Sequence, residues 1–149
     1  DIASGVESKW KSLFENADIL VFGGGDEKYL LEKIFEVGLD KELSGLLQSK
    51  IYVGISAGSM IAARSLSLSD SNLLYDMKFD EEKVEGLGYV DFEIRPHLNS
   101  DHFTKVKIDF LKELSKLNHP VYALDDNSAI KVENGNVTVI SEGEWKLLN

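Results

Sequence analysis

The sequence contains a serine at a position typical of an enzymatic nucleophile. A mostly apolar run over residues 51–55 leads into the pattern Gly-x-Ser-x-Gly, with the serine at Ser56, and a helix-forming run follows. A serine in a sharp strand-to-helix turn has its hydroxyl exposed at the end of the sheet. Gly54 and Gly58 carry no Cβ, so strand and helix can approach closely. The pattern predicts attack on an acyl carbon, with the N–H of Ala57 donating to the oxyanion. Similar glycine-rich turns also bind phosphate or simply reverse the chain.

A serine nucleophile needs a base that accepts its proton and an acid that orients the base. The chain has three histidines. We favour His97 as the base over His102, because His97 directly follows a proline at the end of an expected strand. The third histidine, His119, precedes a proline and suits a capping or surface role. The acid is expected at the end of the next strand, at Asp125 or Asp126. The alternative is that all of these side chains only stabilise turns.

A run of three glycines is a second candidate for binding the oxyanion. Gly23, Gly24 and Gly25 follow the apolar run over residues 19–22, so one of their N–H groups could join that of Ala57 from a neighbouring strand end. A plain tight turn and a phosphate cradle are the alternatives. No Lys-Ser or Lys-Thr pair follows the glycines, which excludes a P-loop.

The composition is that of one soluble globular domain. The 149 residues are 43% hydrophobic and 28% charged, and 16 Lys and Arg face 26 Asp and Glu, which leaves a net charge of −10. Nucleic-acid and anionic-membrane partners need a basic face and are therefore disfavoured. There is no cysteine, so disulfides, thiolate metal sites and a cysteine nucleophile are excluded. With no apolar run near the ~20 residues of a membrane span and no secretory signal, we expect a cytoplasmic protein.

Hydrophobic periodicity predicts the elements of the first half of the chain. Apolar residues spaced by three and four predict helices, and short unbroken apolar runs predict strands that are buried on both faces. The predicted elements are a helix over residues 5–16, a strand over 19–22, helices over 27–37 and 41–48, a strand over 51–55, and a helix after Ser56 through Arg64.

The second half begins with a segment over residues 65–85 that has no clear period. It is rich in Ser, Asp and Glu, and we expect a long loop there. Asn134-Gly135 is a strong hairpin signal. The predicted elements are a strand over residues 89–94, a helix over 102–117, a strand over 121–124, a hairpin formed by 129–132 and 137–140, and a terminal strand over 144–148.

This succession predicts one α/β domain over residues 1–149. Strands alternate with helices, so we expect a mostly parallel sheet flanked by helices, with a C-terminal antiparallel hairpin. In such sheets the functional sites lie at the carboxyl ends of the strands. The glycine run, Ser56, His97 and the aspartate pair all follow predicted strands. They are therefore expected at one edge of the sheet.

Several of these segments together resemble the peptidase E family, which comprises α-aspartyl dipeptidases and has the cyanophycinases as relatives. The matching segments are Phe22-Gly23-Gly24-Gly25-Asp26, Gly54-Ile55-Ser56-Ala57-Gly58-Ser59-Met60, Leu87-Gly88 with Pro96-His97, and Leu124-Asp125-Asp126. The resemblance covers nearly the whole chain. It implies an α/β sandwich like that of the class I glutamine amidotransferases, with serine in place of their cysteine.

The resemblance also implies roles for single residues. Ser56 would be the nucleophile, His97 the base and Asp126, the second of the two aspartates, the acid. Gly25 and Ala57 would supply the oxyanion hole. This chemistry needs no cofactor and no metal.

The chain departs from the family pattern where substrate would bind. Asp26 stands where the family commonly has Asn, and residues 99–107 contain no arginine of the kind that holds an acidic substrate side chain in the aspartyl dipeptidases. The candidate substrate-binding residues are Asp26, Arg95, His102 and Lys105. We expect that peptides with an N-terminal Asp are not uniquely preferred.

The sequence thus predicts a serine peptidase that hydrolyses a small peptide with a free amino terminus through an acyl-enzyme on Ser56. The alternatives are an amidase or esterase that acts on a non-peptide small molecule, and a catalytically degenerate relative that only binds. The family fold has further β-α units before the first predicted helix, so the N-terminal units are expected to be missing here. A homo-oligomer, or pairing with a missing N-terminal segment, would then cover the exposed sheet.

Overall fold

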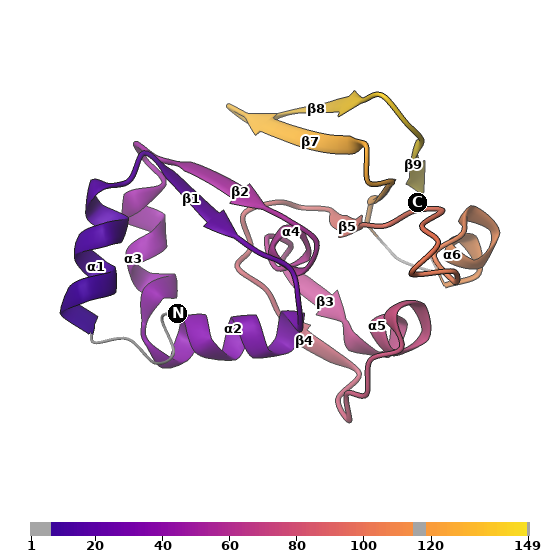
Figure 1. Cartoon of the computed structure of the whole chain (residues 1–149), viewed down its shortest axis with the longest axis horizontal. Coiled ribbons are helices and arrows are strands. Elements are labelled where there is room, and N and C mark those ends of the chain that lie inside the picture. Colours follow the sequence, from indigo (N-terminus) through magenta and orange to yellow (C-terminus); the bar gives the residue numbers. More distant parts are fainter. Residues whose placement is uncertain (1–6, 115–118, 149) are drawn as a thin grey trace. The chain divides into compact units, whose positions relative to one another are not determined.

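The computed structural model of the chain describes residues 7–114 and 119–148. The chain packs into two compact units, Asp1–Ala62 and Ala63–Asn149. A compact unit is not by itself a domain that folds alone, so one domain over residues 1–149 stays a prediction. The mixed α/β class is confirmed, because helices and strands alternate through both units (Figure 1).

The first unit is built on a parallel pair of strands. β1 (Ile19–Phe22) pairs with β2 (Ile51–Gly54) in a register that runs from Ile19 opposite Ile51 to Phe22 opposite Gly54. The helices of this unit are α1 (Glu7–Asn16), α2 (Glu27–Glu36), α3 (Leu39–Leu46) and α4 (Ala57–Met60). The short α4 contacts both strands at their carboxyl ends (Figure 1). The edge of the sheet that carries the predicted nucleophile is therefore covered by α4.

Local signals explain most of these elements. The side chain of Asp26 accepts a hydrogen bond from the N–H of Tyr29, which caps the start of α2. Gly38 has a φ of 71° between α2 and α3, a conformation that favours glycine. The predicted helix after Ser56 is wrong in its length, because α4 ends at Met60 rather than at Arg64.

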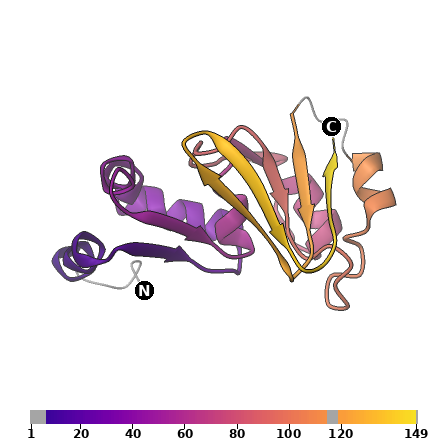
Figure 2. The same cartoon turned by 90° about the horizontal axis from the view of Figure 1, so that it is seen from above.

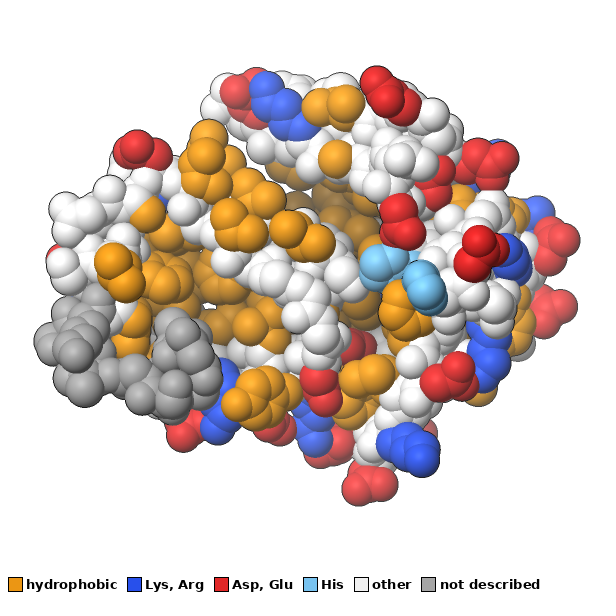
Figure 3. Space-filling view, in the orientation of Figure 1, with side chains coloured by type: hydrophobic (Ala, Val, Ile, Leu, Met, Phe, Trp, Pro, Cys, Tyr) orange, Lys and Arg blue, Asp and Glu red, His pale blue; other side chains and the backbone are white. Residues whose placement is uncertain are grey.

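One face of the first sheet is apolar and exposed. Ile19, Val21, Ile51 and Ile55 are each at least half exposed, and the pairing of the strands places the first three on the same face. We call these four residues the β1–β2 apolar face, and Figure 3 shows the hydrophobic side chains that gather over β1 and β2. The prediction that both faces of these strands are buried is therefore not met within this chain.

The second unit contains three separate small sheets among its described residues. β3 (Ser65–Ser67) pairs antiparallel with β4 (Lys83–Glu85). β5 (Glu93–Arg95) pairs parallel with β6 (Val121–Leu124), which pairs antiparallel with β9 (Trp145–Leu148). β7 (Ser128–Glu133) and β8 (Asn136–Ser141) form the predicted C-terminal hairpin, seen from above in Figure 2. One continuous, mostly parallel sheet stays a prediction.

The predicted loop over residues 65–85 is wrong. It contains β3, the helix α5 (Leu68–Tyr75) and β4. The side chain of Ser67 accepts a hydrogen bond from the N–H of Asp70 and caps α5. Leu66, Leu68 and Leu74 are almost completely buried, so tertiary packing stabilises a segment whose sequence shows no period.

Two other elements of the second unit are shorter than predicted. The helix predicted over residues 102–117 begins only at Ile108, as α6 (Ile108–Leu114), and residues 101–105 form bends and turns instead. Residues 115–118 lie outside the described part of the chain. The strand predicted over residues 89–94 is reduced to β5, with Val90 in an isolated bridge to Ala63.

A hydrophobic cluster holds the second unit together. Leu74 of α5, Leu98, Val106, Leu111 of α6 and Val121 of β6 are buried members of this cluster. The cluster fixes the turns after β5 against α5. Within residues 7–114 and 119–148, no helix has both the length and the apolar composition needed to cross a membrane.

Candidate active site

Ser56 occupies a strained turn between β2 and α4. Its backbone has a φ of 53° and a ψ of −116°, which is an unfavourable conformation for a residue with a side chain. Gly54 and Gly58 make this turn possible. A Cβ on Gly54 would lie 2.4 Å from the carbonyl oxygen of Gly58, and a Cβ on Gly58 would lie 1.9 Å from that of Phe22. The close approach of strand and helix that the sequence predicts is therefore present.

The glycine run lies beside Ser56 within the first unit. A Cβ on Gly24 would be 3.3 Å from the Cβ of Ser56 and 3.6 Å from its Oγ. The N–H of Gly58 donates to the carbonyl oxygen of Gly23 at 3.0 Å, which ties α4 to the run. Gly25 has a φ of 126°, and Ala57 is the first residue of α4. The two predicted oxyanion donors thus belong to segments that meet at Ser56.

His97 and Asp126 form the second half of the predicted triad. His97 Nδ1 and Asp126 Oδ1 are 2.6 Å apart. The histidine side chain is mostly buried, whereas the carboxylate of Asp126 is 61% exposed. The N–H of Leu98 donates to the carbonyl oxygen of Leu124, so the turn that carries His97 is fixed to the end of β6 just before the aspartates. This pairing engages the Nδ1 side of the imidazole with Asp126.

Asp125 has a different set of contacts. Its carboxylate accepts hydrogen bonds from the hydroxyl of Ser128 and from the N–H groups of Asn127 and Glu144. Burial acts to raise the pKa of Asp125, but these hydrogen bonds outweigh it and hold the pKa below its ordinary value. Asp125 therefore organises the turn between β6 and β7, and the geometry favours Asp126 as the partner of His97.

Two aromatic residues form a chain of contacts that ends at the histidine, and no sequence pattern connects them with it. The ring of Phe103 packs against the imidazole of His97 in a tilted arrangement, with ring centres 4.6 Å apart. Tyr75 meets the ring of Phe103 edge-on at 5.4 Å, and its hydroxyl donates to the carbonyl oxygen of Pro96. No sequence signal identifies them, because both are expected only as packing residues.

The candidate substrate-binding residues have other contacts in the structure. Arg95 is 2% exposed and pairs with Glu93 and Asp70. Lys105 pairs with Asp76 on the surface. These cations are therefore engaged in ion pairs within the second unit.

The remaining two candidates are exposed. Asp26 is engaged at the start of α2, where its carboxylate accepts the N–H of Tyr29 at 2.8 Å. His102 lies in a turn, and its N–H donates to the hydroxyl of Ser100. A role in substrate binding stays a prediction for both.

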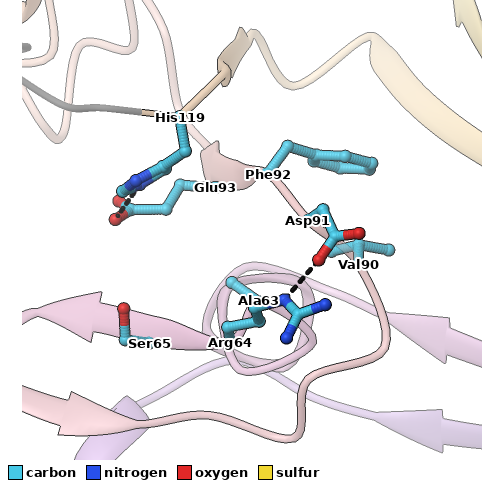
Figure 4. A pocket seen from close by; sticks show the side chains of 8 residues that line it. All are labelled: Ala63, Arg64, Ser65, Val90, Asp91, Phe92, Glu93 and His119. Atoms are coloured by element: carbon cyan, nitrogen blue, oxygen red, sulfur yellow. Dashed lines mark hydrogen bonds and ion pairs between the residues drawn. The ribbon is translucent and has the colours of Figure 1, made fainter.

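The third histidine belongs to a small pocket in the second unit. His119 Nε2 lies 2.8 Å from a carboxylate oxygen of Glu93, whose other oxygen is 2.6 Å from Arg95 in an ion pair. A pocket of about 140 Å³ adjoins this pair (Figure 4). It is lined by Ala63, Arg64, Ser65, Val90, Asp91, Phe92, Glu93 and His119. None of the predicted catalytic residues lines this pocket.

The predicted triad is divided between the two units. Ser56 belongs to the first unit, and His97 and Asp126 belong to the second. The structure describes a strained serine turn with its glycine run, and a histidine–aspartate pair, each within its own unit.

Known proteins with similar sequences are peptidases. The model of peptidase family S51 matches residues 3–140. Peptidase E of Streptomyces coelicolor is 30% identical over 141 residues, which cover 89% of this chain and 56% of that protein. An uncharacterized peptidase of Listeria innocua is 31% identical over 79% of this chain and 61% of its own length. The chain thus spans a little over half the length of these relatives.

Solved structures show the same fold. A Listeria monocytogenes protein described as a candidate peptidase E superimposes with a TM-score of 0.76 at 22% identity, over 96% of this chain and 69% of that one. A peptidase from an acI-B1 actinobacterium gives a TM-score of 0.69 at 21% identity, over 95% of this chain and 60% of its own.

Proposed function

Because the chain belongs to peptidase family S51, we propose that it acts as a serine peptidase on small peptides with a free amino terminus. The observation that carries the proposal is the strained backbone of Ser56, with its positive φ, between β2 and α4, with glycines at both close approaches. Such strain is uncommon for a residue with a side chain and clusters at catalytic positions. The pair of His97 and Asp126 supports it, because a serine needs a base held in one orientation.

The proposed reaction has an acyl-enzyme intermediate. Ser56 Oγ attacks the carbonyl carbon of the scissile amide while His97 Nε2 takes its proton, and Asp126 holds the opposite ring nitrogen. The N–H groups of Gly25 and Ala57 stabilise the oxyanion. His97 then gives the proton to the leaving amine, and water hydrolyses the ester with His97 again as the base. The reaction requires the serine turn and the histidine–aspartate pair to meet in the working enzyme.

The proposed substrates are not limited to peptides with an N-terminal aspartate. Arg95 is buried between acidic side chains, and Lys105 is paired with Asp76. A cation already in an ion pair attracts a substrate carboxylate less strongly, because the existing partner neutralises its charge. We therefore expect similar kcat/KM for neutral and acidic N-terminal residues.

A fluorophosphonate probe followed by a dipeptide panel tests the proposal. The expected result is labelling of Ser56, no labelling of Ser56→Ala, and cleavage of several dipeptides. Labelling without peptide cleavage would favour an amidase or esterase, and no labelling at all would favour a relative that only binds. Loss of activity in His102→Ala but not in His97→Ala would overturn the choice of base.

A further inference from the structure

The imidazole of His97 is held by a chain of aromatic contacts that begins on α5. The ring of Phe103 packs against it with centres 4.6 Å apart and planes inclined by 30°. Tyr75 at the end of α5 meets Phe103 edge-on, with planes at 85°. The hydroxyl of Tyr75 donates to the carbonyl oxygen of Pro96 at 3.2 Å, directly before His97 in the sequence. The helix thus contacts both the backbone before His97 and the ring that covers its imidazole.

A second contact fixes the same helix to the strand before His97. Asp70 of α5 pairs with Arg95 of β5 at 3.1 Å, and the guanidinium is almost completely buried. Leu74 of α5 belongs to the buried core of this unit, and Tyr75 and Phe103 pack against that core. Because α5 is held by both the ion pair and the core, it is a firm support for the turn after β5.

The contact with Phe103 adds to the hold that Asp126 has on the imidazole of His97. The backbone of His97 has a φ of 67°, and its aspartate partner is 61% exposed, so water screens the charge of the carboxylate and weakens its hold on the ring. A ring packed against one face limits rotation about the Cβ–Cγ bond. An aromatic face also attracts the imidazolium that forms when the serine proton is taken.

We propose that Phe103 and Tyr75 are positioning residues that keep the imidazole of His97 aligned with Asp126. This inference rests on the proposed function for its catalytic consequence, but the alignment itself is a property of the second unit. Phe103 acts directly on the ring, and Tyr75 acts through Phe103 and through the carbonyl oxygen of Pro96.

The test that does not depend on activity is proton NMR of the imidazole of His97. In the unaltered protein the Nδ1–H proton that bonds to Asp126 is expected at low field, and the Cε1–H proton is expected to be shifted by the ring current of Phe103. Phe103→Leu should broaden the first resonance through exchange with water and remove the ring-current shift. Phe103→Tyr keeps the ring and should preserve both signals.

Phe110→Leu is the matched control. Phe110 also packs against the core of the second unit, but it has no ring contact with His97 among the described residues. This change should lower the thermal stability about as much as Phe103→Leu does and leave the resonances of His97 in place. If Phe110→Leu and Phe103→Leu shift the resonances equally, or Phe103→Leu leaves them unchanged, the proposal is overturned.

Kinetics on a cleaved dipeptide provide the second measurement. Phe103→Leu should lower kcat about three- to tenfold, because the free energy that an aromatic pair contributes beyond its buried area corresponds to about this change in rate. Tyr75→Phe should lower kcat about two- to threefold, because it removes one neutral hydrogen bond. KM should change little in both. An NMR effect without peptidase activity would refute the proposed function and keep the positioning role, whereas activity with unchanged kcat in Phe103→Leu would refute the positioning role alone.

Discussion

Replacing Asp126 with Asn tests the acid of the proposed triad most directly. The substitution keeps the size of the side chain but removes the charge, and Asn can present its N–H₂ to His97 Nδ1 and so favour the wrong imidazole tautomer. The bond at stake is the one between His97 Nδ1 and Asp126 Oδ1 at 2.6 Å. A hydrogen bond to a charged group contributes about 1.5–3 kcal/mol, which corresponds to about a 10- to 150-fold change in rate.

The exposure of the carboxylate selects the lower part of that range. Asp126 is 61% exposed, so water screens its charge and replaces part of the lost interaction. We therefore expect kcat/KM to fall about 10- to 30-fold in Asp126→Asn. This loss is far smaller than the one expected for Ser56→Ala, because the serine forms the covalent bond itself.

The assay is kcat/KM on a cleaved dipeptide, with two comparison variants. Asp109→Asn alters a 96% exposed carboxylate on α6 and should leave the rate unchanged. Asp125→Asn breaks the hydrogen bonds of the β6–β7 turn and should mainly lower thermal stability. Full activity in Asp126→Asn, or a larger loss in Asp125→Asn than in Asp126→Asn, would refute the assignment.

Four further predictions concern the nucleophile turn, the charges and the exposed sheet. Ser56→Ala and His97→Ala should each abolish turnover, and the double variant should lose no more, which single-turnover rates can check. Gly58→Ala places a methyl group against the carbonyl oxygen at the end of β1 and should lower the free energy of unfolding by about 2–3 kcal/mol in urea titrations; unaltered stability would contradict the close approach. The folded pKa of Asp125 is depressed, so its contribution to stability is present above its unfolded pKa of about 4 and is lost as the pH falls from there through the lower folded pKa; the stabilities of the unaltered protein and of Asp125→Asn should approach each other over that acid range. The β1–β2 apolar face should cause concentration-dependent self-association in sedimentation experiments, and Val21→Thr should weaken it; association that Val21→Thr leaves unchanged would exclude this face.

The elements that the sequence alone determined are those with strong local signals. β1, β2 and β6 are short apolar runs ended by glycine or aspartate, and they lie where the sequence predicts them. The hairpin of β7 and β8 turns at Asn134 and Gly135, which both have a positive φ, as this turn type requires. The serine turn was predictable for the same reason. Its two glycines lie against backbone atoms that are either a few residues away in the chain or at the end of the paired strand.

Tertiary structure decided the features that depend on contacts between distant residues. Residues 65–85 have no period of their own, and α5 forms there because Leu68 and Leu74 are buried against other segments. The choice between the two aspartates was open in the sequence, since adjacent residues share the same strand end. In the structure their side chains have different partners: Asp125 accepts the N–H groups of its own loop, and Asp126 lies beside His97, 29 positions away.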